Sequence, residues 1–122
     1  MTNYNPGNVI LVNIAFSGAV GYKRRPAVII SKDSFNTAGI KLVVAAVTNN
    51  VTPPFRPGDT LLNDWGVAGL LKPSAVRGVL ATVDKSDVMR KLGALSQNDL
   101  SKVEQGIADI LGFQITSPPP TP

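Results

Sequence analysis

The order of apolar and polar residues predicts a series of short strands followed by a single helix. Residues 9–16, VILVNIAF, form an almost continuous apolar run rich in β-branched side chains, which is typical of a strand covered on both faces. Residues 32–39 are predicted to form a turn and residues 64–68 a single helical turn. Similar apolar runs with turn-forming boundaries predict further strands at residues 27–31, 41–48, 59–63, 72–78, 79–83 and 88–95.

The pattern changes to a helical period after Ser96. Ser96 is a typical N-cap, and Asp99, three residues later, favours the first turn of a helix. Gly112 is a typical residue at a helix C-terminus, so an amphipathic helix is predicted at Gln97–Leu111. Its apolar positions are Leu100, Val103, Ile107, Ile110 and Leu111. Six or seven short strands and one terminal helix predict an α+β fold, in which the helix packs on a small antiparallel β-barrel.

The length of the chain, 122 residues, predicts one domain. We assign residues 1–115 to this domain and residues 116–122, with four prolines in seven positions, to a disordered tail. The sequence contains no run of about 18 apolar residues, and its N-terminus MTNYNPG lacks the pattern of a secretory signal. We therefore expect a cytoplasmic protein that does not enter a membrane.

The charge of the chain is unevenly distributed. Up to Arg77 there are eight basic and three acidic side chains, whereas the remaining residues include four basic and five acidic ones. Such a positive region favours a polyanionic partner, such as a nucleic acid or an acidic protein, although a merely soluble basic surface has the same composition. Because cysteine and histidine are absent, thiolate chemistry, the usual general base and the common zinc sites are excluded, and no metal or other cofactor is expected.

Arg25 is the cation best placed for chemistry that depends on geometry. It precedes Pro26, which fixes the backbone at the entrance of a strand and restricts Arg25 to an extended conformation. Thr48 ends the strand predicted at Lys41–Thr48, and the short connection between the two strands requires an antiparallel pair if they are neighbours. Arg25 and Thr48 would then lie at one end of the sheet, where both side chains are able to donate to phosphate oxygens.

The other candidate residues each have a simpler structural interpretation. Lys23 and Arg24 are typical of a solvated loop, and Arg77 of a strand position that faces water. Thr48 alone is more typical of a strand former or a turn hydroxyl. Trp65 and Phe55 offer rings for stacking on nucleic-acid bases, but packing in the core or against another subunit is the more frequent role of such residues.

Six segments, in their order along the chain, resemble the PemK/MazF family of toxin–antitoxin endoribonucleases, which are also called mRNA interferases. Together they span residues 7–113. The segments are GNVILVNIAFS, KRRPAVIISKDSFN, VVAAVTNN, GLLKPSAVR, ATVDKS and KLGALSQNDLSKV.

The resemblance implies a small SH3-like or CcdB-like barrel that acts as a homodimer and cleaves single-stranded RNA without a metal ion. It places the catalytic arginine and threonine of the family on Arg25 and Thr48. The implied reaction is attack of an RNA 2′-hydroxyl on the adjacent phosphorus, which leaves a 2′,3′-cyclic phosphate and a 5′-hydroxyl. Lys23, Arg24 and Arg77 are the candidate RNA-binding residues, and an acidic antitoxin is the expected protein partner. The general base stays open between a carboxylate, a perturbed arginine and solvent.

Two other functions are compatible with the same fold. CcdB-like toxins poison DNA gyrase through their terminal helix, and a catalytically silent relative would bind RNA without cleaving it. The combination of Arg25 with Thr48 favours neither of these two functions but the one that the resemblance implies: a sequence-selective endoribonuclease toxin of a type II toxin–antitoxin system.

Overall fold

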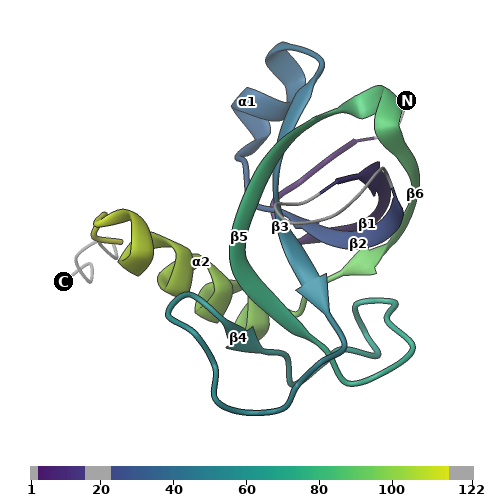
Figure 1. The fold of residues 1–122 in the computed structure, drawn as a ribbon. Coiled ribbons are helices and arrows are strands. Elements are labelled where there is room, and N and C mark those ends of the chain that lie inside the picture. The colour runs from purple at the N-terminus through teal and green to yellow at the C-terminus, as the bar shows by residue number, and fades with distance from the viewer. Residues whose placement is uncertain (1–2, 16–22, 116–122) are drawn as a thin grey trace, which may run out of the picture.

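A computed structural model describes residues 3–15 and 23–115, and this part of the chain forms one curved sheet, two α-helices and a short 3-10 turn (Figure 1). No helix in this part is long and apolar enough to cross a membrane. In chain order the elements are β1 (Asn8–Ile14), β2 (Lys23–Ile29), α1 (Asp33–Ala38), β3 (Lys41–Thr48), β4 (Thr60–Leu61), β5 (Ala75–Asp84), the 3-10 turn η1 (Lys85–Asp87), β6 (Val88–Ala94) and α2 (Gln97–Leu111).

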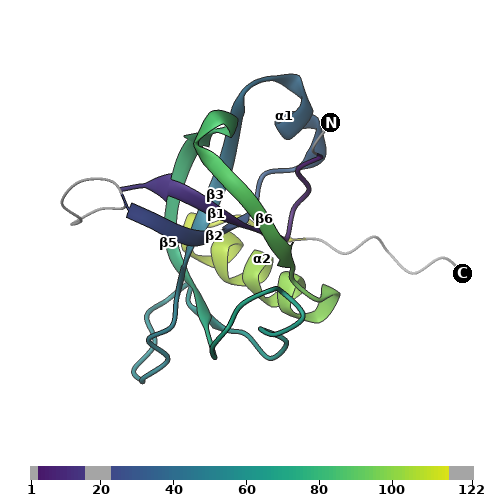
Figure 2. The ribbon, with the colours of Figure 1, turned by 90° about the vertical axis from the view of Figure 1, so that its right-hand side faces the viewer.

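The strands form a single sheet in the order β4-β5-β3-β2-β1-β6, and every neighbouring pair is antiparallel. The sheet curls strongly, and α2 packs against it on the side of β4 and β5 (Figures 1 and 2). The antiparallel α+β fold with a C-terminal helix is thereby confirmed. Among the described residues β4 does not pair with β6, so the predicted barrel is open; β4 contributes only two residues to the sheet.

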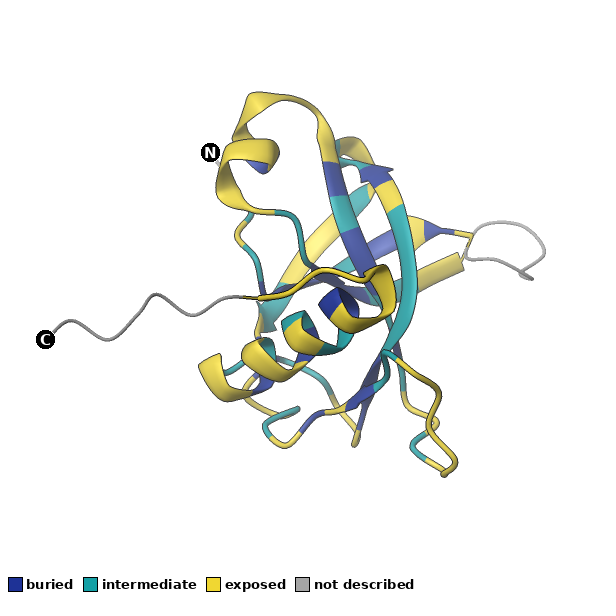
Figure 3. Ribbon diagram, turned by 90° about the vertical axis from the view of Figure 1, so that its left-hand side faces the viewer, coloured by how far each residue is buried: buried dark blue, intermediate teal, exposed yellow. Residues whose placement is uncertain are grey.

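Alternate residues of the strands enter two separate apolar clusters. Val9 and Val28 pack with Val103 and Ile107 of α2, and the exposed residues of α2 lie on its opposite side (Figure 3). Ile10, the neighbour of Val9, belongs to the second cluster. Because successive side chains of a strand point to opposite faces, β1 is covered on both sides at Val9 and Ile10, whereas Leu11, on the face of Val9, is only half-buried. The other members of the second cluster are Val12, Ile14, Ala27, Ile29, Leu42, Val44 and Val83.

Several predicted boundaries are wrong. The segment at residues 32–39, predicted as a turn, contains α1, which Asn36 fastens to the domain: its buried amide nitrogen donates to the carbonyl oxygens of Tyr4 at 3.0 Å and Ser31 at 2.8 Å. The strands predicted at residues 72–78 and 79–83 are the single strand β5, and the strand predicted at 59–63 is reduced to β4. The tail at residues 116–122 and the loop residues 16–22 lie outside the described residues.

Gly69 allows the segment after β4 to cross close to β6. Its φ of +83° is a left-handed conformation that favours glycine, and a Cβ atom there would lie 2.1 Å from the carbonyl oxygen of Leu92. Backbone therefore touches backbone at this crossing. The residues that follow, 70–72, form one wall of the cavity described below.

Asp99 ties the first turn of α2 to the same segment. Its buried carboxylate accepts hydrogen bonds from the backbone N–H groups of Asn63 at 3.1 Å and Asp64 at 2.8 Å. Its own N–H donates to Oγ of Ser96 at 3.2 Å, which confirms the predicted N-cap. Asp99 therefore fixes the position of α2 relative to the chain that enters the cavity wall.

Replacing Asp99 by asparagine tests this connection. Asp99→Asn keeps the shape of the side chain but leaves one acceptor oxygen for two N–H donors. We expect the free energy of unfolding to fall by about 1–3 kcal/mol, the usual cost of an unpaired buried polar group, in a urea titration followed by circular dichroism. Asp109→Asn changes an exposed residue of the same helix and should cost less than about 0.5 kcal/mol. Equal effects of the two substitutions would contradict the proposed role.

Candidate functional site

The pairing of β2 with β3 brings Arg25 and Thr48 to one end of the sheet. The two strands are antiparallel, and Ala27 lies opposite Ala46. Arg25 precedes Ala27 by two residues and Thr48 follows Ala46 by two, so continuation of this register places Arg25 and Thr48 opposite each other. Side chains at directly opposite positions lie on the same face of a sheet, with Cβ atoms roughly 4.5–5.5 Å apart. The predicted antiparallel arrangement of the two strands is confirmed.

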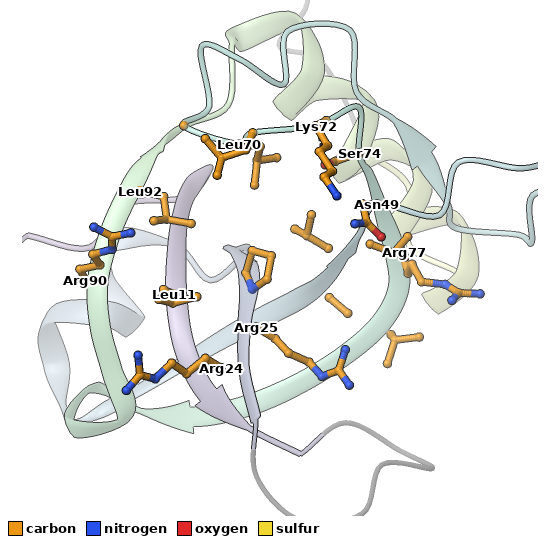
Figure 4. Close-up of a pocket in the computed structure, with 17 residues that line it drawn as sticks. Leu11, Arg24, Arg25, Asn49, Leu70, Lys72, Ser74, Arg77, Arg90 and Leu92 are labelled. Atoms are coloured by element: carbon orange, nitrogen blue, oxygen red, sulfur yellow. The ribbon is translucent and has the colours of Figure 1, made fainter.

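Both residues line a cavity of ≈ 810 Å³ (Figure 4). A volume of this size is in the range of cavities that hold organic ligands, roughly 300–1,000 Å³. No acidic residue contributes to its lining within the described part of the chain. Apolar walls with basic groups around them suit a polyanion that also carries rings or other apolar surface. The apolar lining includes Leu11, Pro26, Val47, Leu70 and Leu92, and the basic lining is Arg24, Arg25, Lys72, Arg77 and Arg90.

Arg25 is less exposed than the cations beside it. It is half-buried, whereas Lys23 and Arg24 are exposed. Its Nε is buried and has no hydrogen-bond partner among the described residues. Buried donors without a partner are rare in native proteins and normally cost about 1–3 kcal/mol, so each calls for an explanation. In Figure 4 the guanidinium of Arg25 extends toward the side of the cavity where Arg77 lies, while Arg24 extends the opposite way. A bound phosphate would supply an acceptor for this guanidinium.

The hydroxyl of Thr48 is oriented by the turn that follows β3. Its Oγ1 accepts a hydrogen bond from the backbone N–H of Asn50 at 3.1 Å. The side-chain oxygen of Asn50 in turn accepts from the N–H of Thr52 at 3.2 Å. No acceptor for the Thr48 hydroxyl proton occurs among the described residues, so this proton is available to a ligand oxygen.

Arg77 lies in a bulge of β5. The register between β3 and β5 shifts between Ala45 and Val47, so residues 77–79 of β5 face a single residue of β3. A bulge bends its strand and changes the direction of a side chain, and bulges are common beside active sites. Arg77 lines the edge of the cavity from β5, and its guanidinium extends outward from that edge (Figure 4).

A second, smaller cavity of ≈ 170 Å³ adjoins the first, because Thr48 and Arg77 line both. Asp59, which also lines it, accepts hydrogen bonds from the backbone N–H groups of Arg56 at 3.0 Å and Gly78 at 3.3 Å. Within residues 3–15 and 23–115, Asp59 is the one acidic residue in the lining of these two cavities. Its two hydrogen bonds join the loop before β4 to the bulge of β5.

The structure separates the remaining candidate residues. Lys23 is the first residue of β2 and is exposed. Arg24 lines the large cavity, whereas Lys23 does not. Trp65 packs against the core, in agreement with the more frequent role of such residues, whereas Phe55 is 41% exposed and lines the small cavity.

Sequence reasoning missed the contribution of β6. Arg90 and Leu92 line the large cavity because β6 pairs with β1, where Arg90 lies opposite Leu11. These residues are far apart in the sequence, and no local pattern signals their pairing. Lys72 was likewise noted only as part of a strand, although it stands on the cavity wall.

The fold and the cavity together define a small protein with a curved antiparallel sheet, a C-terminal helix and a basic cavity lined by Arg25 and Thr48. Residues 5–111 match the sequence profile of the PemK-like, MazF-like toxins of type II toxin–antitoxin systems. The chain is also 30% identical over 97 residues to the endoribonuclease MazF2 of Mycobacterium bovis, a match that covers 78% of this chain and 84% of the relative. The endoribonuclease MazF6 of Mycobacterium tuberculosis matches over the same length with the same identity. The chain therefore belongs to the PemK/MazF family of toxins of type II toxin–antitoxin systems.

Solved structures of this family share the fold. A mycobacterial endoribonuclease in complex with its cognate antitoxin superposes with a TM-score of 0.72 at 19% identity, covering 95% of this chain and all of that one (100%). The MazF in a MazE–MazF structure from Deinococcus radiodurans gives a TM-score of 0.72 at 19% identity, covering 93% and 100% of the two chains.

The basic lining of the cavity leads to a prediction about salt. Replacing Arg24 by glutamine removes one cation from the wall, so an uncleavable single-stranded oligonucleotide should bind with a weaker salt dependence. We expect the slope of log K against log salt concentration to become shallower by about 0.7, the contribution of one phosphate contact on a single strand, in fluorescence anisotropy titrations. Lys32→Gln, an exposed cation beside α1, is the matched control and should leave the slope as it is. A slope that responds equally to both substitutions would show that the cavity is not the binding surface.

Proposed function

We propose that this MazF-like endoribonuclease toxin cleaves single-stranded RNA by internal transphosphorylation, with Arg25 and Thr48 as its catalytic residues and without a metal ion. The observation that carries the proposal is the position of the two side chains at one end of the β2–β3 pair, on the wall of one basic cavity. The names of the relatives as endoribonucleases favour cleavage over gyrase poisoning and over silent RNA binding.

In the proposed reaction the RNA supplies its own nucleophile. The 2′-oxygen forms a bond to the adjacent phosphorus while the bond from phosphorus to the 5′-oxygen of the next nucleotide breaks. One product ends in a 2′,3′-cyclic phosphate and the other begins with a 5′-hydroxyl. The 2′-hydroxyl loses a proton, and the departing 5′-oxygen gains one.

Arg25 and Thr48 act on the charge that develops during this step. The phosphoryl oxygens become more negative in the transition state, and donors that are already fixed in place stabilise that charge without reorganisation. The guanidinium offers donors in a planar fork that matches two phosphate oxygens. The Thr48 hydroxyl donates to the same phosphate, because its oxygen is already engaged by the N–H of Asn50.

Solvent water accepts the proton in this proposal. A guanidinium carries hydrogen-bond donors and no acceptor, so Arg25 serves as a donor rather than as the base. Both carboxylate oxygens of Asp59 already accept backbone hydrogen bonds, so this side chain is engaged in holding the loop before β4.

Lys23, Arg24 and Arg77 bind the RNA backbone on either side of the cut. Arg24 and Arg77 stand on opposite sides of the cavity (Figure 4), and Lys23 extends the positive surface beyond its edge. An acidic segment of a cognate antitoxin in the cytoplasm would use the same cations and exclude RNA.

A peptide of this kind should displace a bound oligonucleotide in a competition titration, and simultaneous binding of both would contradict a shared surface.

A second copy of the chain completes the binding groove. Leu71 lines the cavity yet is 93% exposed, and Val67 on the same segment is 73% exposed. Exposed apolar side chains grouped in this way favour a subunit interface.

Light scattering after size exclusion should give the mass of a dimer at micromolar concentration. A monomer at that concentration would contradict the assembly.

Removing either catalytic side chain should nearly abolish cleavage. Arg25→Ala and Thr48→Val are each expected to lower the single-turnover rate by about 10²–10³-fold, the effect of losing one preorganised donor to a developing oxyanion. The assay follows a long single-stranded RNA in excess chelator and tests the new ends for 5′-hydroxyl groups. Lys32→Ala and Thr82→Val, both exposed, are the matched controls and should cleave like the wild type. Undiminished cleavage by either catalytic variant, or a strict need for a divalent ion, would contradict the mechanism.

A further inference from the structure

We propose that the small cavity beside Thr48 binds the base of one nucleotide that flanks the scissile phosphate, and that Asn50 and Phe55 determine which base is accepted. The inference rests on the proposed function, because it takes the phosphate at Arg25 and Thr48 as its point of reference. It adds a specificity subsite with named residues to that function.

The position of the small cavity fits a neighbouring nucleotide. Thr48 and Arg77 line both cavities, so a strand whose phosphate contacts Thr48 has the small cavity directly beside that contact. Arg77 stands between the two spaces and is able to contact the phosphate that joins the nucleotides. The cavity therefore lies along the path of the chain that is being cut.

The size and lining of the cavity suit one base. Its volume of ≈ 170 Å³ lies well below that of cavities for drug-sized ligands, roughly 300–1,000 Å³, which limits the occupant to a small group. Its lining is mainly polar, unlike a gap in a core. The side chains that carry this polarity are those of Thr48, Asn50, Thr52, Arg56, Asp59 and Arg77.

Phe55 offers an exposed ring at the edge of the small cavity. It is the aromatic residue in the lining and is 41% exposed, in contrast to Trp65, which packs against the core. Aromatic rings that stay exposed beside a basic groove stack on the bases of single-stranded nucleic acids, and every base offers a suitable face.

Asn50 supplies the hydrogen bonds that distinguish bases. Its Oδ1 accepts from the N–H of Thr52, so the amide is oriented with its Nδ2 group left to donate. No acceptor for Nδ2 occurs among the described residues. An amide donor of this kind selects bases that present a carbonyl oxygen or ring nitrogen rather than an amino group. Because the N–H of Asn50 also orients Thr48, the base-reading residue and the catalytic hydroxyl belong to one turn.

The cavity is formed before a ligand arrives. Asp59 binds the N–H groups of Arg56 and Gly78, which holds the loop that carries Phe55 against the bulge of β5. Gly58 adds to this close approach, because a Cβ atom there would lie 3.2 Å from Cα of Gly78. A preformed wall costs little ordering entropy on binding and favours discrimination between ligands.

The first test maps base preference. Wild type, Asn50→Asp and Phe55→Ala are incubated with an RNA library that is randomised over a short window, and the new ends are sequenced. Asn50→Asp keeps the oxygen that accepts from Thr52 but replaces the donors by an acceptor, so the preferred base at one position beside the cut should change toward one with an amino group. Phe55→Ala should flatten the preference at that same position. An unchanged base profile in both variants overturns the proposal, whatever happens to the rate.

Matched controls separate this effect from a general loss of structure. Phe35 is 44% exposed, nearly the same as Phe55, but lies on α1 at the opposite end of the molecule (Figures 1 and 2). Asn98 is an exposed asparagine on α2. Phe35→Ala and Asn98→Asp should retain both the rate and the base profile of the wild type. If they shift the profile as much as the cavity variants do, the small cavity is not the source of specificity.

The second test does not depend on cleavage. Oligonucleotides with a 2′-deoxy nucleotide at the cut cannot react, and their affinity is measured by fluorescence anisotropy. The Phe55→Ala variant loses the stacking of one base, so its affinity for the oligonucleotide should fall by roughly 5- to 150-fold. The Phe35→Ala variant should bind like the wild type. Equal affinities of Phe55→Ala and wild type would overturn the subsite. A wild type that fails to cut RNA but shows this loss of affinity would refute the proposed reaction and retain the subsite.

Discussion

The antiparallel pairing of β2 with β3 is the constraint on which the site depends. It places the start of one strand beside the end of the other, so that Arg25 and Thr48 line one cavity although more than twenty residues separate them in the chain. Pro26 adds rigidity at this point, because it fixes the backbone next to Arg25 and has no N–H to extend the ladder. A guanidinium that starts from such a strand keeps its direction, whereas Lys23 and Arg24 remain exposed.

The residues around Arg25 and Thr48 come from elements that are far apart in the sequence and are brought together by the strand order of the sheet. The bulge of β5 places Arg77 at the edge of the cavity, and Asp59 holds that bulge to the loop before β4. On the other side β6 brings in Arg90 through its pairing with β1. Four of the eight basic residues up to Arg77, together with Arg90, thus line one space, where phosphates would interact with several cations at once.

The sequence predicted those parts of the structure that are fixed by local chemistry. The helix Gln97–Leu111 has its cap at Ser96 and its left-handed residue at Gly112, as expected, because capping depends on neighbouring residues alone. The end of β3 at Thr48 was also predicted. In contrast, α1 has no side-chain cap and depends on Asn36, whose partners include Tyr4 from a distant part of the chain. The strands predicted at residues 72–78 and 79–83 are one strand, because β5 continues through the bulge that contains Gly78. The contribution of β6 to the cavity follows from strand order, which no local pattern contains.

The central claim is that Arg25 and Thr48 act on the same phosphate. A crystal structure of the protein with a single-stranded RNA that carries one 2′-deoxy nucleotide at the cut would test it directly. The account predicts a guanidinium nitrogen of Arg25 and Oγ1 of Thr48 within about 3 Å of the oxygens of one phosphate group. A complex in which the two side chains contact different phosphates, or in which the RNA lies outside the cavity, would contradict it.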